Sequence, residues 1–416
     1  MSEATAVSTD LWPGVARVPS VGIKARVARL IVKNALSRFP VRAVFANGDV
    51  WGHRDGNLPV LKVDRPQALF ARLGADSKIG FGEAYMAGDW TTGPDTDLAD
   101  LLSPFAAKLT NVVPDSLRKF RRFVDANLPH HERNTLEGSA KNIQRHYDLS
   151  NDLFAQFLDP TMTYSSAWFE DLTHGADLET AQERKMDAIL DYAEVTTGTR
   201  VLEIGSGWGA LAIQAAQRGA KVTTLTISHE QAALARERFA AAGVDVDLQL
   251  RDYREVSGEY DAIVSVEMIE AVGEEYWPTY FKTIDRVLAP GGRVSLQGIT
   301  MAHDRYQETR NSYGWIQKYI FPGGLIPSLQ AIDETLAEHT SLAVEDSRAI
   351  GEHYAETLRQ WRERFNANWP AINAQGFDET FRRMWEFYLA YCEAGFRVGY
   401  INVHQLKITR PEVSHG

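Results

Sequence analysis

A glycine-rich turn between a predicted strand and a predicted helix carries the clearest chemical signal in the chain. The segment is VLEIGSGWGALA (201–212), in which an apolar run leads into Gly205, Gly207 and Gly209 and a helix-forming run follows directly. Glycine allows a backbone to turn tightly and allows its N–H groups to approach a ligand closely. Such a turn also occurs without a ligand, so the surrounding residues must decide between a structural turn and a cofactor site.

The spacing around these glycines distinguishes two classes of cofactor. A dinucleotide site would carry G-x-G-x-x-G and an acidic residue at the end of the second strand. Here the spacing is E-x-G-x-G-x-G from Glu203, and the second strand ends in TLTIS (224–228). This form resembles S-adenosylmethionine (SAM) methyltransferases, whose cofactor has no pyrophosphate. The resemblance implies that Gly205 and Gly207 face the methionine and ribose of SAM, that Glu203 orients the loop, and that RDYRE (251–255) holds the adenine.

These segments belong to a regular alternation of strands and helices that starts near residue 199. The predicted strands are TRVLEIG (199–205), KVTTLTIS (221–228), VDVDLQL (244–250), YDAIVSVE (260–267) and GRVSLQGIT (292–300). Such alternation predicts an α/β fold with a parallel, doubly wound sheet, which binds ligands at the carboxyl ends of its strands. Beyond residue 300 the chain is predicted to be mainly helical, and YINVHQLKITR (400–410) to close it as an edge strand.

The residue pattern of the N-terminal third predicts a smaller α+β domain. An amphipathic helix is expected at 22–39, a hairpin with an Asn-Gly turn at 41–52, and a strand at 58–63. Residues 66–126 are predicted to be mostly helical and include a basic patch at 117–124, and a polar linker follows at 127–142. We therefore predict two domains, 1–130 and 131–416.

Charge and composition narrow the classes of function. Net charge is −11 over 416 residues, which disfavours a nucleic-acid partner, yet residues 11–47 hold seven basic residues and no acidic one. A basic helix on an acidic protein indicates a membrane surface as partner. A single cysteine, Cys392, and the lack of a signal-peptide layout or a long apolar run predict a cytoplasmic protein at the membrane periphery. No spacing of Cys or His suggests a metal site.

Six further motifs, in this order along the chain, resemble the cyclopropane-fatty-acyl-phospholipid synthase family and the related mycolic acid cyclopropane synthases. They are HYDLSNDLF (146–154), MTYSSAWFE (162–170), LTISHEQ (225–231), YREVSGEYDAIVSVEMIEAVG (253–273), KYIFPGGLIPS (318–328) and FYLAYCEAGFR (387–397). A weaker match around GFGEAYMAGDW (80–90) resembles the extra N-terminal domain of the phospholipid-acting members. The resemblance implies a class I SAM-methyltransferase sheet with a helical acyl-binding insertion, and methyl transfer from SAM to the cis double bond of an acyl chain.

The family's functional residues are carried over by position. The implied SAM contacts beyond the glycine loop are Tyr164, Ser165, Thr226, Gln231, Asp252, Tyr253 and Arg254. The family also binds a bicarbonate ion that acts as general base beside the methyl group. Its implied surroundings, and hence the implied catalytic residues, are Ser166, Glu270, Gln297, Ile299 and Tyr388.

Three positions, two of them among these residues and one beside Glu270, depart from the family pattern. The family commonly has cysteine at Ser166, and histidine at Ala271 and Gln297. An amide does not titrate near neutral pH, so Gln297 cannot relay a proton as imidazole can. Bicarbonate, held by Gln297 and Tyr388, would give a cyclopropane; a displaced base would give a methylene branch that a separate reductase could convert to a methyl branch. Because SLQGITM (295–301) with KYIFPGGLIPS resembles the methylases of the 10-methyl fatty acid pathway, we predict the methylene product.

Two other classes of function remain as alternatives. One is methylation of a soluble small molecule, against which the basic helix and the aromatic residues of 300–400 argue. The other is a lipid-binding scaffold without turnover, against which the intact glycine loop and Glu270 argue. The sequence leaves the oligomeric state open, with a homodimer as one alternative.

Overall fold

The computed structural model describes residues 7–108, 150–172 and 175–411. They form two compact units. The N-terminal unit holds residues 7–108 with Ser312–Ile320 and Trp361–Tyr400, and the sheet unit holds the other described residues. The predicted linker at 127–142, the basic patch at 117–124 and the predicted boundary at 130/131 lie outside the described residues. The division into domains 1–130 and 131–416 therefore stays a prediction.

The sheet unit is built on seven strands in the order β10-β11-β9-β8-β5-β6-β7. Their bounds are β5 Arg200–Ile204, β6 Lys221–Thr226, β7 Val246–Leu250, β8 Tyr260–Val266, β9 Leu288–Met301, β10 Ala343–Ala349 and β11 Ile401–Thr409. Strands β7, β6, β5, β8 and β9 run parallel, whereas β11 is antiparallel to both β9 and β10. The order reverses between β5 and β8, so their carboxyl ends border the crevice where such sheets bind ligands.

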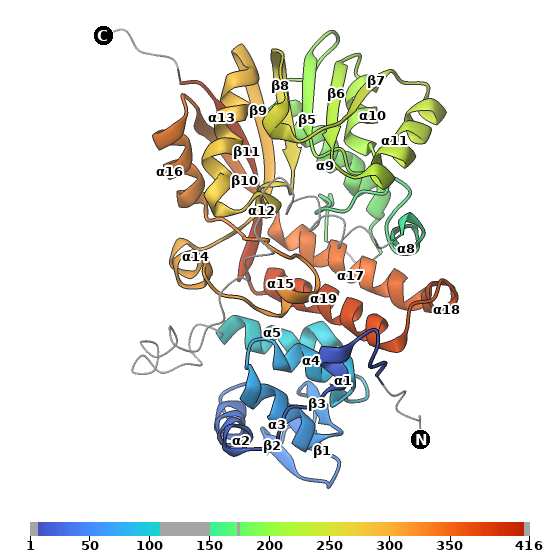
Figure 1. Ribbon diagram of the computed structural model, residues 1–416, viewed down its shortest axis with the longest axis vertical. Coiled ribbons are helices and arrows are strands. Elements are labelled where there is room, and N and C mark those ends of the chain that lie inside the picture. Colours follow the sequence, from blue (N-terminus) through green and yellow to red (C-terminus); the bar gives the residue numbers. More distant parts are fainter. Residues whose placement is uncertain (1–6, 109–149, 173–174, 412–416) are drawn as a thin grey trace. The chain divides into compact units, whose positions relative to one another are not determined.

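Helices cover both faces of this sheet because side chains of each strand alternate between the faces. One face packs Leu202 and Ile263 against helices that include α13 (Trp277–Val287) and α16 (Leu329–His339). The other packs Val201 and Val264 against helices that include α9 and α10. Figure 1 places α10 and α11 near β6 and β7, and α13 and α16 near β9 to β11. The remaining bounds in this unit are α8 Asn151–Ala155, α9 Leu178–Tyr192, α10 Ala210–Gln217, α11 His229–Ala242, α12 Ile269–Val272 and α14 His303–Thr309. Helix α17, Gly351–Ala367, belongs to this unit up to Gln360 and to the N-terminal unit from Trp361.

The parallel strands agree with the prediction, but the C-terminal edge does not. The segment at 400–410 forms β11, which lies inside the sheet between β9 and β10 rather than at the edge. The true edge strand is β10, AVEDSRA, whose exposed polar residues give no strand-like alternation of apolar side chains. The prediction of an edge strand at 400–410 is wrong because the sequence gives no signal for a further strand at 343–349.

The N-terminal unit contains a four-stranded sheet in the order β2-β1-β3-β4. Its strands are β1 Arg42–Phe45, β2 Val50–Gly52, β3 Val60–Val63 and β4 Trp90–Thr92. The hairpin of β1 and β2 is confirmed, with Gly48 at φ 87° in its turn. Its helices are α1 Pro13–Ala16, α2 Ile23–Leu36, α3 Pro66–Ala75, α4 Gly80–Ala87, α5 Leu98–Lys108, α15 Trp315–Tyr319, α18 Trp369–Ala374 and α19 Glu379–Arg397.

Aromatic side chains from three distant parts of the sequence form the core of the N-terminal unit. The ring centroid of Phe387 lies 4.8 Å from that of Trp315 and 6.2 Å from that of Trp90. Gly82 lets this packing occur, since a Cβ there would lie 2.5 Å from the Trp315 ring. These contacts explain why segments near residues 315 and 387 belong to the same compact unit as residues 7–108. Their role as an acyl-binding insertion stays a prediction.

Helix α2 carries its apolar residues on the outside. Ile23 is 79%, Leu30 68% and Ile31 60% exposed, and Ala25 and Leu36 are its buried residues. Arg29 and Lys33 of the same helix lie over the ring of Trp51. Within the described residues, no helix is both long and apolar enough to cross a membrane.

Candidate active site

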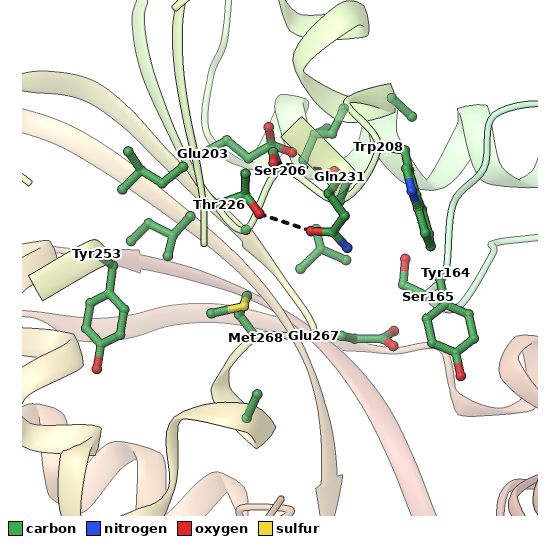
Figure 2. Close-up of a pocket in the computed structure, with 18 of the residues that line it drawn as sticks. Tyr164, Ser165, Glu203, Ser206, Trp208, Thr226, Gln231, Tyr253, Glu267 and Met268 are labelled. Carbon is green, nitrogen blue, oxygen red and sulfur yellow. Dashed lines mark hydrogen bonds between the residues drawn. The ribbon is translucent and has the colours of Figure 1, made fainter. Parts of the chain in front are cut away.

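A pocket of about 180 Å³ opens in the sheet unit at the carboxyl ends of β5, β6 and β8. Figure 2 shows Tyr253 at one side of it and Tyr164 and Trp208 at the other, with Glu203, Thr226 and Gln231 between them. All ten predicted SAM contacts line this pocket: Tyr164, Ser165, Glu203, Gly205, Gly207, Thr226, Gln231, Asp252, Tyr253 and Arg254. The structure thus brings the predicted cofactor residues together from four separate stretches of the sequence into one cavity.

The glycine loop after β5 needs its glycines for conformation and for space. Gly205 has φ 94°, and a Cβ on it would lie 2.6 Å from the Met268 side chain. Gly207 has φ 49°, and a Cβ there would meet no heavy atom within 4 Å among the described residues, because it faces the open pocket. Side chains disfavour positive φ. The loop therefore offers bare backbone to a ligand, as a SAM site requires.

The end of β6 is held in a fixed geometry by α11. Ser228 caps this helix by accepting a hydrogen bond from the Gln231 N–H at 3.2 Å. The Thr226 hydroxyl donates to the Gln231 amide oxygen at 3.0 Å, and both side chains are buried. Figure 2 draws the Gln231 amide nitrogen on the side away from Thr226. An N–H₂ donor in this position suits an anionic or carbonyl group of a ligand.

The segment after β7 is organised by an ion pair. Asp252 accepts two hydrogen bonds from the Arg254 guanidinium, at 2.8 and 2.7 Å, and a third from its N–H. The Arg254 guanidinium lies over the Tyr253 ring at 5.4 Å. Arg254 and Asp252 thus stabilise the turn that places the Tyr253 ring at the pocket. An aromatic wall here is what an adenine ring would need.

Lys185 is a pocket residue that the sequence reasoning missed. It lies on α9, is 1% exposed, and donates a hydrogen bond of 2.6 Å to the Ser165 hydroxyl. Burial lowers its pKa to about 8, opposed by the charges of Glu267, Asp159 and Glu203. Gln182, one helical turn away, donates to the Ser165 carbonyl at 2.9 Å. Together Lys185 and Gln182 fix the backbone that carries Tyr164 and Ser165.

Glu203 is buried at the end of β5 and accepts a hydrogen bond of 2.5 Å from the Thr224 hydroxyl. Burial raises its pKa to about 8, opposed by Thr224 and Lys185. Its hydrogen bond links β5 to β6 rather than to the glycine loop. Glu203 therefore stabilises the pocket wall by joining β5 to β6, the two strands that lead into it.

Glu267 is the second missed residue, and it gathers two of the predicted catalytic residues. One carboxylate oxygen accepts hydrogen bonds of 2.9 Å from the Ser166 N–H and from the Gln297 amide. The other accepts one of 3.0 Å from the Tyr354 hydroxyl. Gln297 is fully buried, and its amide oxygen accepts a hydrogen bond of 3.0 Å from Gln405. Glu267 lines the pocket, whereas Ser166 and Gln297 stand behind it.

Glu270 lies one short turn further, on α12. One of its carboxylate oxygens accepts a hydrogen bond from the Ile299 N–H; the other, although buried, has no hydrogen-bond partner within the described residues. Burial and the charge of Glu267 raise the pKa of Glu270 to about 8. An unpaired buried carboxyl oxygen indicates a group poised for a ligand or a proton.

The structure thus connects four of the five predicted catalytic residues, Ser166, Glu270, Gln297 and Ile299, through Glu267 and its neighbours. The fifth, Tyr388, belongs to the N-terminal unit, where its ring packs on Trp385 at 5.2 Å. Its catalytic role stays a prediction, as do the roles of the other four. In the described part of the chain, no group of His, Cys, Asp and Glu is arranged to hold a metal ion.

The order of the seven strands and the glycine loop define a SAM-dependent methyltransferase of class I. Comparison with known proteins agrees: the family model described as mycolic acid cyclopropane synthetase matches residues 134–406. The cyclopropane synthase CmaA1, solved with SAH and CTAB, superposes with a TM-score of 0.59 at 30% identity, over 68% of this chain and 98% of that one. MmaA2 of Mycobacterium tuberculosis superposes with the same TM-score at 31% identity, over 68% of this chain and 98% of that one.

Full-length relatives extend the match to the N-terminal residues. A protein of Mycobacterium tuberculosis named tuberculostearic acid methyltransferase UfaA1 is 47% identical, over 98% of this chain and 97% of its own length. The cyclopropane-fatty-acyl-phospholipid synthase of Escherichia coli is 36% identical, over 86% of this chain and 89% of its own. The chain belongs to the cyclopropane synthase family of SAM-dependent methyltransferases. Family membership confirms the predicted class of fold and of reaction.

Proposed function

We propose that the protein transfers the methyl group of SAM to the cis double bond of an unsaturated acyl chain in a membrane phospholipid. The proposed product is a methylene-branched chain, such as the 10-methylene precursor of a 10-methyl chain. The observation that carries the proposal is the half-buried carboxylate Glu267, which lines the cofactor pocket and accepts hydrogen bonds from Ser166 and Gln297. The names of the relatives support an acyl substrate: one is a methyltransferase for a fatty acid, the other a fatty-acyl-phospholipid synthase.

The reaction asks three things of the protein. SAM, when bound, supplies a methyl group on a positively charged sulfur, and an alkene is a weak nucleophile that must be held against it. The cation left on the acyl chain would react with water, so the site must be dry. The pocket wall includes Ile204, Trp208 and Met268, which are suited to exclude water. Finally, a base must remove a proton.

The position and timing of that base decide the product. The methyl group adds to one carbon of the double bond and leaves the positive charge on the other. Immediate loss of a methyl proton would close a cyclopropane ring. If a hydride first moves from the branch carbon to the neighbouring cation, loss of a methyl proton leaves a methylene branch. A cyclopropane formed with bicarbonate as base is the alternative.

Gln297 favours the methylene product. Its amide is held on one side by Gln405 and on the other by Glu267, and it does not titrate near neutral pH. We therefore assign Gln297 to fixing the position of a neighbouring base rather than to carrying the proton.

Product analysis with labelled cofactor tests this proposal. The full-length protein is incubated with dioleoyl phospholipid vesicles and SAM carrying a ¹³C-labelled methyl group. Both products lose one methyl proton and have equal mass, so the lipid is analysed by ¹³C NMR. We expect the label in a terminal alkene carbon. Label in a ring carbon would establish the cyclopropane alternative, and labelling of a soluble small molecule instead of lipid would contradict an acyl substrate.

We also propose that helix α2 attaches the enzyme to the membrane surface. Its exposed Ile23, Leu30 and Ile31 lie on a helix that also carries four basic residues and no acidic one. Apolar side chains flanked by cations match the interface of an anionic lipid layer. Residues 1–130 would then act as a lipid-associated domain, and residues 131–416 as the catalytic domain that receives the acyl chain.

Further partners follow from the proposed product. A methylene branch becomes a methyl branch only by reduction, so we propose that a separate reductase acts on the product lipid. The single cysteine fits a reducing, cytoplasmic compartment for the enzyme. We keep a homodimer as the proposed assembly, to be tested by light scattering on the purified protein.

A further inference from the structure

We propose that the Glu267 carboxylate is the general base of the reaction and stands in the place of the exchangeable bicarbonate ion. This inference rests on the proposed methyl transfer to an acyl double bond and deepens it. It names a residue that the motif comparison did not assign.

The donors expected around a bicarbonate ion are already engaged by carboxylates of the chain. Ser166 and Gln297, both assigned to the bicarbonate surroundings, donate to one oxygen of Glu267, each at 2.9 Å. Ile299, a third such residue, donates its N–H to Glu270. A carboxylate and a bicarbonate ion carry the same charge on the same planar O–C–O group. The Glu267 carboxylate therefore satisfies the donors that an ion would otherwise need to satisfy.

The backbone of Glu267 is in a conformation that glutamate rarely adopts. Its φ is 51°, directly after the end of β8, and its N–H donates to the Gln297 carbonyl at 2.7 Å. Residues other than glycine hold a positive φ only where the surroundings enforce it, and such residues gather at functional sites. Glycine would fit this backbone without strain. The chain keeps a carboxylate here and holds it in place with hydrogen bonds.

The surroundings of Glu267 favour its ionised form over that of Glu270. Three groups donate to Glu267, namely Ser166, Gln297 and Tyr354, and the Lys185 ammonium adds a favourable charge. Burial raises the pKa of Glu267, and these four groups oppose that rise. Glu270 accepts one N–H, and the negative charge of Glu267 raises its pKa further. Of two neighbouring half-buried carboxyls, the one with more donors takes the charge.

The proton transfer is balanced without any further reactant. A C–H bond of the transferred methyl group breaks, and its electron pair becomes the double bond to the branch carbon. The proton passes to a carboxylate oxygen of Glu267, which becomes a neutral carboxylic acid. The methyl group arrives as a cation and one proton leaves, so no oxidant or reductant is needed. The proton returns to solvent when the product leaves.

The test uses the full-length protein on dioleoyl phospholipid vesicles with SAM, in buffer freed of carbon dioxide and in buffer with added bicarbonate. We expect wild-type turnover to be the same in both. We expect Glu267→Gln to lower turnover by about 100-fold or more in both, since a positioned base contributes at least that much. Glu267→Gly should lose as much turnover without bicarbonate and regain turnover with added bicarbonate or formate. Glycine leaves the space of the carboxylate free for the ion and adopts the positive φ without strain.

Glu259→Gln, which changes an exposed carboxylate away from the pocket, is the matched control and should keep wild-type turnover. SAM affinity and the unfolding midpoint of each variant are measured alongside. If Glu267→Gln does not fold, two measurements still decide whether Glu267 is the base. They are wild-type turnover in carbonate-free buffer and the rescue of Glu267→Gly by bicarbonate or formate. Wild-type turnover that requires bicarbonate, or a Glu267→Gln variant that remains active, would overturn Glu267 as base while leaving methyl transfer intact. A wild type that methylates no lipid in either buffer would instead overturn the proposed function.

Discussion

Helices α2 and α9 depart from the usual distribution of polarity in opposite directions. Helix α2 exposes large apolar residues, whereas α9 buries a lysine and a glutamine among apolar ones. Exposed apolar side chains destabilise the folded protein unless a partner covers them. A buried lysine destabilises it unless the ammonium group is paired. Each helix thus keeps side chains that reduce the stability of the fold: exposed apolar residues on α2 and a buried lysine on α9. We propose that each departure serves a ligand: a lipid surface at α2 and the cofactor pocket at α9.

The largest effect is expected on the outer face of α2. Replacing Ile23, Leu30 and Ile31 together by serine should weaken binding to phospholipid vesicles by at least about 100-fold, because each aliphatic side chain contributes roughly 1–2 kcal/mol when buried in lipid. Vesicle sedimentation measures it. Leu172→Ser, which removes an exposed leucine elsewhere, is the control. Unchanged binding of the triple variant would remove α2 from the membrane contact.

The next effect is expected at the buried face of α9. Lys185→Met should lower SAM affinity by about tenfold or more, because the Ser165 hydroxyl loses its partner and Glu203 and Glu267 lose a neighbouring cation. The free energy of unfolding should fall by about 1–3 kcal/mol. Calorimetric titration and denaturant unfolding measure the two. Lys24→Met, which changes an exposed lysine of α2, should change neither. A Lys185→Met variant with normal SAM affinity would limit Lys185 to a role in folding.

A smaller effect is expected from the charges of α2. Lys24→Gln with Arg26→Gln should weaken binding to anionic vesicles by about 2 kcal/mol in total at low salt, since each cation contributes about 1 kcal/mol near such a surface. The loss should shrink as salt rises. Vesicles of neutral lipid are the control. An equal loss on neutral vesicles would show that the helix itself, rather than its charge, had been damaged.

The smallest effect is expected at Glu270, the carboxyl next to Glu267. The pKa of Glu270 is raised from 4.5 to about 8, so its contribution to stability is present below pH 4.5 and is lost as pH rises to about 8. Between pH 7 and pH 8, Glu270→Gln should therefore lose less unfolding free energy than the wild type, by about 1 kcal/mol. Denaturant unfolding at both pH values measures this. Glu259→Gln should follow the wild type, and a parallel loss in Glu270→Gln would contradict the raised pKa.

The parallel strands and the cofactor residues could be predicted because their signals are local. Gly205 and Gly207 belong to one motif. Each of β5 to β9 is recognisable from a short stretch of contiguous or alternating apolar residues. Strand β10 could not be predicted, because most of its residues are exposed and polar, so it shows no apolar alternation. As a result β11 was wrongly placed at the edge of the sheet.

The missed site residues lacked a local signal or had one that was easy to overlook. Gln182 and Lys185 fall at the spacing of Leu178, Ala181 and Ile189, the buried face of α9, so their polarity at core positions was a usable sign. Glu267 lies three residues before Glu270, and its positive φ cannot be read from residue types. Its partners come from positions 166, 297 and 354, which only the fold brings together.

The position of β11 inside the sheet has a consequence for the order of biosynthesis. A nascent chain makes β5 to β9 and β10 well before β11, yet β11 lies between β9 and β10 and supplies Gln405. Until residue 405 leaves the ribosome, Gln297 lacks the neighbour that orients its amide toward Glu267. The glycine loop and the strands around it are complete more than a hundred residues earlier. During synthesis, the cofactor pocket can therefore take shape before the carboxylate network beside it is finished.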